Sequence, residues 1–119
     1  MALPQNSPNN EVIVSSRLAD VSAASTCYAA AVARGKLVRS YSVIDAALTT
    51  TDCTWTMQVN GVAVTGTATI TQSGSAAGDV DELVISSPVE VNRGDTIAWI
   101  SGGESDTTAV ANFYAVIRT

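Results

Sequence analysis

A strictly alternating stretch between Cys53 and Val59 constrains the fold more than any other part of this chain. Cys53, Trp55, Met57 and Val59 alternate there with Thr54, Thr56 and Gln58. A period of two is typical of a β-strand with one face in a core and the other in water. Trp55 is the largest side chain on the apolar side, and we expect it to be buried. The stretch therefore predicts a half-buried strand around which the core forms.

The run before this stretch, from Arg34 to Ile44, also has the pattern of a strand. One face carries Leu37, Arg39, Tyr41 and Val43, and the other carries Val38, Ser40, Ser42 and Ile44. A polar connection, residues 45–52, separates the two runs. Two strands joined in this way predict the first antiparallel pair of a sheet.

Turn signals divide the rest of the chain into further short strands. The Asn60-Gly61 dipeptide suits a type I′ turn and predicts a hairpin between residues 54–59 and 62–64. The other strand candidates are residues 11–16, 67–71, 82–86, 88–91, 96–101 and 110–118. Pro88 has no N–H to donate, so we expect it at a strand start or at a sheet edge. Eight or nine short strands predict an all-β, single-domain antiparallel β-sandwich or jelly-roll-like barrel.

Residues 17–33 are compatible with two structures. Their many alanines favour a helix over residues 22–33, which Asp20 or Ser22 could cap and Gly35 could end. In contrast, Tyr28, Ala30 and Val32 alternate as a strand would. In the second case a turn over residues 33–36 would join this strand to the next one as a hairpin. The residues alone leave both structures open.

Composition limits the size and the partners of the protein. The chain has 119 residues, enough for one domain with one core. Only 14% of the residues are charged and the net charge is −5, with no basic stripe, so we expect no nucleic-acid partner. No apolar run approaches the roughly 20 residues that span a bilayer, and the first residues do not resemble a signal peptide. We therefore expect no membrane partner and synthesis in a cytoplasm.

The residue types that carry catalysis are sparse. The chain has no histidine, which removes imidazole from any zinc site or catalytic triad. Cys27 and Cys53 are the only cysteines, and in a reducing cytoplasm we expect two buried thiols. The acidic residues fall in turns, and no nucleotide-binding or hydrolase motif occurs. We therefore expect neither an enzyme nor a bound cofactor.

Two short motifs allow a functional and a structural interpretation. Asp79, Asp81 and Glu82 could offer oxygens to calcium, but the remaining ligands of a recognised loop are missing, which favours a solvated acidic turn. Arg93-Gly94-Asp95 spells an integrin-binding tripeptide. Gly94 also suits a tight turn between two strands, and we prefer that interpretation.

Four segments give the chain a family resemblance. Residues 43–56, 59–64 (Val-Asn-Gly-Val-Ala-Val), 70–80 (Ile-Thr-Gln-Ser-Gly-Ser-Ala-Ala-Gly-Asp-Val) and 91–97 (Val-Asn-Arg-Gly-Asp-Thr-Ile) resemble the small head proteins of tailed bacteriophages. These are the decoration, or cement, proteins, with a jelly-roll-like β fold. The resemblance implies a strand over residues 25–33 and no catalytic residues. It also implies a homotrimer that binds the major capsid protein on the outside of the assembled head, and hence a location on the virion.

Residues 1–10 precede the β-sandwich domain expected over residues 11–119. They contain Pro4, Pro8 and three asparagines and little to bury, so they are either a loose terminus or an extended arm. In the second case Leu3, Pro4, Gln5, Asn6 and Pro8 are the candidate contacts with the capsid or a neighbouring subunit.

The alternative function is a phage fibre, knob or tail-associated module that binds a host glycan. It would need an exposed aromatic platform, whereas Trp55 and Trp99 both fit core positions of strands.

Overall fold

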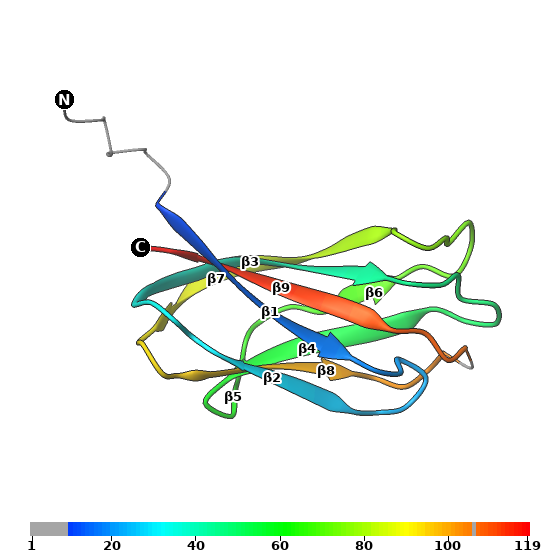
Figure 1. Cartoon of the computed structure of the whole chain (residues 1–119), viewed down its shortest axis with the longest axis horizontal. Coiled ribbons are helices and arrows are strands. Elements are labelled where there is room, and N and C mark those ends of the chain that lie inside the picture. Colours follow the sequence, from blue (N-terminus) through cyan, green and yellow to red (C-terminus); the bar gives the residue numbers. More distant parts are fainter. Residues whose placement is uncertain (1–9, 106) are drawn as a thin grey trace.

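The computed structural model describes residues 10–105 and 107–119, and in these residues it contains strands and loops but no helix. The strands are β1 (Glu11–Leu18), β2 (Thr26–Ala30), β3 (Gly35–Ile44), β4 (Cys53–Val59), β5 (Val62–Ala63), β6 (Ala68–Ile70), β7 (Val80–Val91), β8 (Thr96–Ser101) and β9 (Ala111–Arg118). The all-β class and the strand count predicted from alternation are confirmed (Figure 1).

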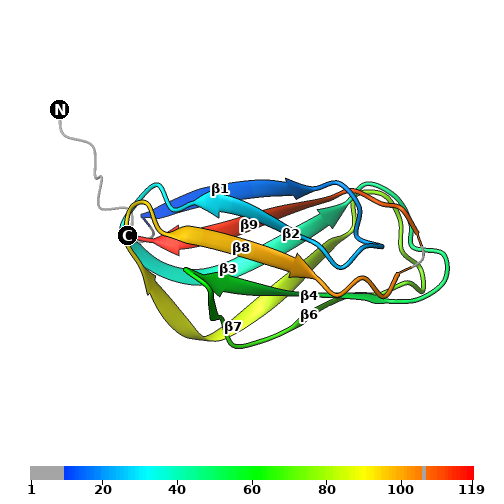
Figure 2. The same cartoon turned by 90° about the horizontal axis from the view of Figure 1, so that it is seen from below.

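The strands form two antiparallel sheets that pack face to face. One sheet has the order β1-β9-β3-β7, and the other has the order β2-β8-β4-β5, with β6 paired to β4 on the same side as β5. From β1 to β4 each strand lies in the opposite sheet from the one before it. This alternation, with the strand order above, is that of a jelly roll. Figures 1 and 2 show the two layers from perpendicular directions.

Two sequence-based predictions of strand pairing are wrong for the same reason. The runs expected to pair across residues 45–52 became β3 and β4, and the hairpin expected around residues 33–36 would have joined β2 to β3. In both cases the two strands belong to different sheets and are not hydrogen-bonded partners. Each connection crosses the sandwich instead of folding back along one sheet.

The ambiguous segment is a strand, not a helix. Residues 26–30 form β2, an edge strand that pairs along its whole length with β8. Asp20 does make the hydrogen bond expected of a helix cap, since its Oδ1 accepts from the Ser22 N–H at 2.9 Å. The chain then turns instead of coiling. Val21 is fully buried, and its N–H donates to the carbonyl of Ala109. This hydrogen bond holds the β1–β2 loop against the loop between β8 and β9.

The hairpin at Asn60-Gly61 is confirmed. The two residues have φ angles of 51° and 81°, both positive as a type I′ turn requires. The turn joins β4 to β5, with Val59 opposite Val62.

A β-bulge at Val38 corrects the predicted faces of β3. Leu37 lies opposite Ile117 of β9 and Arg39 lies opposite Val116, so Val38 is an extra residue on β3. The bulge places Leu37 on the inner face together with Ser40, Ser42 and Ile44, all buried. The sequence pattern had grouped Leu37 with Arg39, Tyr41 and Val43, because strict alternation cannot register an inserted residue.

Strand β7 is continuous where two shorter strands were expected, but its pairing with β3 is interrupted. Leu37 pairs with Val89 and Arg39 pairs with Val84, which leaves residues 85–88 of β7 without partners on β3. Pro88 lies in this interruption, and β7 is the outer strand of its sheet. Its position at a sheet edge therefore agrees with the prediction.

The core joins the two sheets through aromatic rings and two serines. Trp55 of β4 and Trp99 of β8 are buried and both contact Phe113 of β9, with ring centroids 5.0 and 6.0 Å apart. The Trp55 Nε1–H donates to Ser42 Oγ at 3.2 Å, and the Trp99 Nε1–H donates to Ser40 Oγ at 2.9 Å. Each tryptophan of one sheet thus finds its polar partner on the other sheet, which explains why two serines occupy inner positions of β3.

Candidate functional site

Hydrogen bonds within the acidic loop between β6 and β7, and from this loop to β3, fix its conformation. Asp79 Oδ2 accepts from the Ala76 N–H at 2.9 Å, and the Gly78 N–H donates to the Ile44 carbonyl at 2.7 Å. Burial and the neighbouring Asp79 raise the pKa of Asp81. The described part of the chain holds no group of three or more Asp, Glu or Cys side chains placed to bind a metal ion. The geometry supports the interpretation of this segment as a structural turn.

Arg93-Gly94-Asp95 forms the tight turn between β7 and β8, as expected. Gly94 has a φ of 91°, and the Asp95 Oδ2 accepts from the Asn92 N–H at 2.8 Å. This hydrogen bond, with a contribution from Asn60, lowers the pKa of Asp95. The carboxylate that an integrin would need is therefore already used to close the turn.

The two cysteines are free thiols in the structure, as predicted. Both are buried, and both lie in the same sheet, Cys27 on β2 and Cys53 on β4. Strand β8 lies between β2 and β4, so the Cα atoms are separated by at least about two strand spacings, roughly 9.6 Å. A disulfide needs Cα atoms within about 7 Å. Burial raises the pKa of both thiols.

The candidate contact residues Leu3, Pro4, Gln5, Asn6 and Pro8 lie outside the described residues. The first described residue, Asn10, is tied to the other end of the chain. Its carbonyl oxygen accepts from the Thr119 N–H at 2.8 Å and from the Thr119 Oγ1–H at 2.9 Å. Asn10 therefore lies beside the C-terminus, at the end of the sandwich marked C in Figure 1.

On the outer face of the β1-β9-β3-β7 sheet, alternation points side chains away from the core. Adjacent strands align its side chains in rows, read from β1 to β7. They are Ile13, Val116, Arg39 and Val84; then Ser15, Tyr114, Tyr41 and Glu82; then Arg17, Asn112, Val43 and Val80. Ile13, Val80 and Val84 are 64%, 60% and 71% exposed, and both tyrosines are partly exposed. We call this set of residues the outer sheet face.

A single cation lies in the middle of the outer sheet face. Arg39 is exposed, and the Tyr41 side chain raises its pKa, with smaller contributions from Glu11 and Glu82. The outer sheet face thus combines apolar, aromatic and charged groups. Reasoning from the sequence did not identify it as a site, because only the pairing register shows that β9 separates β1 from β3.

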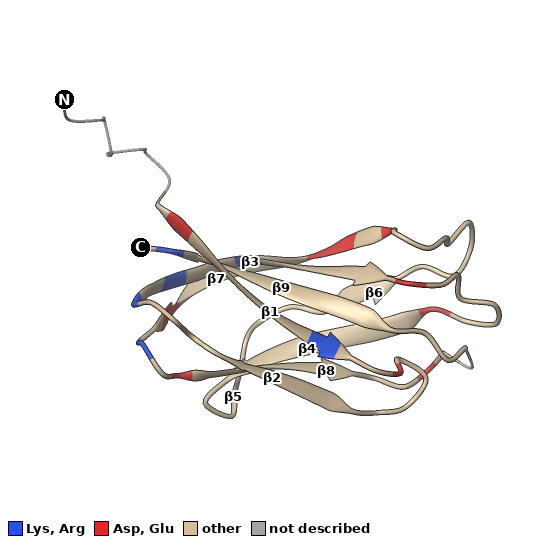
Figure 3. Ribbon diagram, in the orientation of Figure 1, with Lys and Arg blue, Asp and Glu red and all other residues tan. Residues whose placement is uncertain are grey.

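Charge is divided between the two ends of the sandwich. Four of the six Lys and Arg residues, Arg34, Lys36, Arg93 and Arg118, lie at the end that carries Asn10 and the C-terminus, together with the carboxylates Glu11, Glu90 and Asp95. The loops at the opposite end carry Asp20, Asp45, Asp52, Asp79 and Glu104, with Asp81 and Glu82 at the start of β7. Figure 3 shows most blue segments near the C-terminus, one at the tip of β1, and most of the red segments toward the far end. We call these the basic end and the acidic end.

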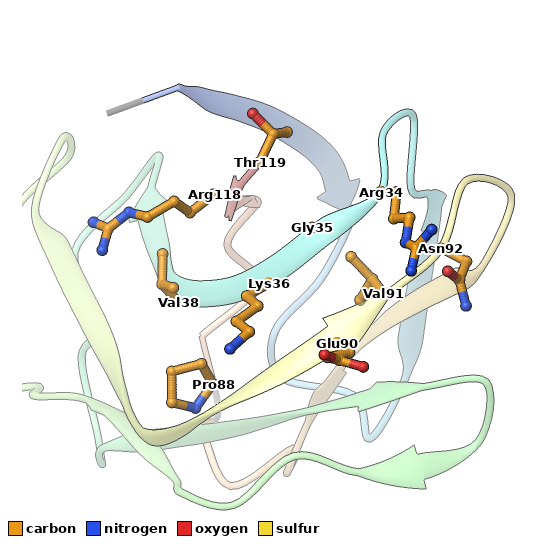
Figure 4. A pocket seen from close by; sticks show the side chains of 10 residues that line it. All are labelled: Arg34, Gly35, Lys36, Val38, Pro88, Glu90, Val91, Asn92, Arg118 and Thr119. Carbon is orange, nitrogen blue, oxygen red and sulfur yellow. The ribbon is translucent and has the colours of Figure 1, made fainter. Parts of the chain in front are cut away.

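A hollow of about 420 Å³ lies at the basic end. Its lining comes from β3, β7, the end of β9 and the residues beside them: Arg34, Gly35, Lys36, Val38, Pro88, Glu90, Val91, Asn92, Arg118 and Thr119. It lies where β7 loses its pairing with β3, so Val38 and Pro88 both face it. In Figure 4 the Lys36 side chain extends toward Pro88 and Glu90, while Arg34 lies beside Asn92.

Comparison with known proteins identifies the fold but no family. The sequence matches no protein-family model and no curated protein. The structure is similar to a chain of the cyanophage Pam1 capsid asymmetric unit, with a TM-score of 0.52 and 13% identity over 99% of this chain and 91% of that one. It is also similar to a family 35 carbohydrate-binding module from Clostridium thermocellum, with a TM-score of 0.51 and 10% identity over 92% of this chain and 93% of that module.

A third similar structure is much longer. The chain spans 24% of the catalytic unit of a GH87 α-1,3-glucanase from Streptomyces thermodiastaticus, with a TM-score of 0.50 and 13% identity. At these identities the similarity describes the fold alone. The same β-sandwich therefore occurs in a phage capsid and in a carbohydrate-binding module, and the choice between such functions depends on the surfaces described above. No helix in the described residues is long and apolar enough to cross a membrane.

Proposed function

We propose that this protein decorates and stabilises the outside of an assembled bacteriophage head. Its partner would be the major capsid protein, its assembled form a homotrimer and its location the virion surface, after synthesis in the host cytoplasm. In this proposal it is a structural protein without catalytic activity. The Val-Asn-Gly-Val-Ala-Val and Gln-Ser-Gly-Ser-Ala-Ala-Gly-Asp segments, which resemble head decoration proteins, are consistent with this function.

The observation that carries the proposal is the outer sheet face. Ile13, Val80 and Val84 leave most of their side-chain surface in water on one side of a single sheet. Together with the partly exposed Tyr41 and Tyr114 of the middle row, these side chains give the outer sheet face apolar and aromatic surface for contact with another protein. Low overall charge adds to this argument, because a surface with few ions can be covered without leaving many of them unpaired.

A cement protein acts by adding buried area across the joints between capsid subunits. About 1,600 Å² of buried surface suffices for stable association when the surfaces are complementary. Three linked copies would raise the effective concentration of each contact and convert weak single contacts into tight binding.

A matched pair of substitutions tests the role of the outer sheet face. Val84 on this face and Val62 on the other sheet are both 71% exposed. We expect Val84→Glu to weaken binding to undecorated heads in a cosedimentation assay, while Val62→Glu binds as the unmodified protein does. Equal binding by both variants would contradict the assignment of the outer sheet face.

One feature favours the glycan-binding alternative. Tyr41 and Tyr114 are directly opposite on β3 and β9 and both are partly exposed, with Glu82 and Ser15 at the ends of the same row. Aromatic rings beside polar groups can hold a sugar, whereas Trp55 and Trp99 are buried and cannot. A glycan array would test this function: binding that is lost in Tyr41→Ala, by a protein that does not bind heads, would favour it.

A further inference from the structure

The hollow at the basic end has the chemistry of a binding site for a carboxylate. Its rim carries Arg34, Lys36 and Arg118, and all three side chains are exposed. Arg118 is already paired, because its Nη2 lies 3.0 Å from the Glu11 Oε2, and this is the one ion pair within 4.0 Å among the described residues. Lys36 and Arg34 therefore retain charge that a ligand could neutralise.

The apolar side chains and the one carboxylate that line the hollow limit the class of ligand. Val38 and Pro88 supply apolar surface, and Glu90 lies directly across from Lys36 in the strand register. A polyphosphate chain would place charge after charge beside Glu90, which disfavours nucleic acid. An extended peptide segment that alternates a carboxylate with an apolar side chain fits both features, and its backbone N–H could donate to Glu90.

The position of the hollow connects it to the rest of the basic end. Thr119 lines the hollow and binds Asn10, so Asn10, the first described residue, lies beside the hollow. The opposite end carries carboxylates with Arg17 as its nearby cation. The basic end carries Glu11, Glu90 and Asp95 beside its four cations, whereas carboxylates predominate at the acidic end. A negatively charged surface would therefore repel the acidic end more strongly, and so orient the molecule with the basic end toward it.

We infer that the hollow at the basic end binds an acidic, extended segment of the capsid subunit that this protein decorates. The inference rests on the proposed function for the source of the segment. The ligand chemistry, one or more carboxylates on a strand-like peptide with apolar neighbours, follows from the hollow itself.

A peptide experiment tests the ligand chemistry without phage heads. The probe is a terminally blocked hexapeptide alternating leucine with aspartate, and its control has asparagine at each aspartate. We expect the acidic peptide alone to give saturable shifts in the amide resonances of Gly35, Lys36 and Val91. Shifts that are equal for both peptides, that map to another surface, or that appear instead with a single-stranded oligonucleotide would overturn the inference.

Charge reversal tests the source of the segment on heads. Arg34→Glu combined with Lys36→Glu should weaken head binding at least about tenfold and reduce its salt dependence. The control is Arg93→Glu, an exposed cation at the same end that neither lines the hollow nor belongs to the outer sheet face, and it should weaken head binding far less. If the unmodified protein binds heads and the double variant binds equally well, the inference is wrong. If the unmodified protein does not bind heads, the proposed function is wrong, and so is the capsid origin of the bound segment. The peptide experiment then shows by itself whether the hollow binds acidic peptides.

Discussion

At the scale of single residues, the interior depends on two tryptophan–serine pairs that cross the sandwich. Ser40 accepts from the Trp99 indole and donates to the Tyr114 carbonyl at 2.7 Å, while Ser42 accepts from the Trp55 indole. No buried side-chain nitrogen or oxygen among the described residues lacks a hydrogen-bond partner. Removal of one serine would therefore leave a buried N–H unpaired, which is costly in an apolar interior.

We expect Ser40→Ala to lower the free energy of unfolding by about 1–3 kcal/mol, the usual cost of an unsatisfied buried polar group. Urea denaturation measures this loss. Ser15→Ala, on the exposed side of β1, is the control and should change stability by less than about 0.5 kcal/mol. In a double-mutant cycle, the stability losses of Ser40→Ala and of Trp99→His or Trp99→Phe should not add, because each substitution removes the same indole–serine hydrogen bond. Stability unchanged by Ser40→Ala would refute the role of this pair.

The cysteines give a second prediction at this scale. Burial keeps both thiols from solvent and raises their pKa, so little thiolate forms at neutral pH. Without reductant, iodoacetamide should modify neither Cys27 nor Cys53 in the folded protein and both after denaturation, as mass spectrometry would detect. A denatured protein with no adducts, and a mass lower by two hydrogens, would indicate a disulfide instead.

At the scale of elements, Glu104 connects the β8–β9 loop to the first residues of β4. Its carboxylate accepts from the Thr54 N–H at 3.1 Å and from the Thr54 Oγ1–H, and these bonds lower the pKa of Glu104. A carboxyl group whose pKa is lower in the folded state stabilises the fold above its unfolded pKa. That contribution is lost as the pH falls through the folded pKa.

Thr54→Val should therefore lower the melting temperature at pH 7, and the difference from the unmodified protein should shrink as the pH falls below about 4. Thermal denaturation over a pH series measures both quantities. Thr56→Val, on the same face of β4 but away from Glu104, is the matched control. A difference that stays constant with pH would show that the charge of Glu104 is not involved.

The sequence predicts the strands well because alternation is a local property. It located the strand at residues 53–59, the turn at Asn60-Gly61 and the inward position of Trp55. It did not predict which sheet each strand joins, because the crossings from β2 to β3 and from β3 to β4 depend on contacts far apart in the chain. The bulge at Val38 was missed because a valine carries no signal for an inserted residue.

The candidate surfaces were harder to predict than the fold. The outer sheet face brings Ile13, Val84 and Tyr114 together from strands remote in sequence. The hollow likewise needs Arg34, Pro88 and Thr119 to meet at one end. Composition gave only the scarcity of charge, whereas the division into a basic and an acidic end appears once the strand directions are known.

At the scale of the whole molecule, the hollow and Asn10 both lie at the basic end. We expect a variant without residues 2–9, which keeps Asn10 and its bonds to Thr119, to fold with a nearly unchanged melting temperature. If Leu3, Pro4, Gln5, Asn6 and Pro8 contact the capsid or a neighbouring subunit, this variant should bind heads more weakly and protect them less against heat. Equal binding by the full and shortened proteins would exclude that role for these residues.

The number of copies bound per head shows whether this protein decorates phage heads. Undecorated heads would be saturated with the purified protein, separated from the excess and imaged, and the bound mass compared with that of the capsid. We expect density repeated at every equivalent position of the capsid lattice, with a copy number proportional to the number of capsid subunits. Density at a single vertex would instead favour a tail-associated module, and the absence of bound protein would contradict the claim.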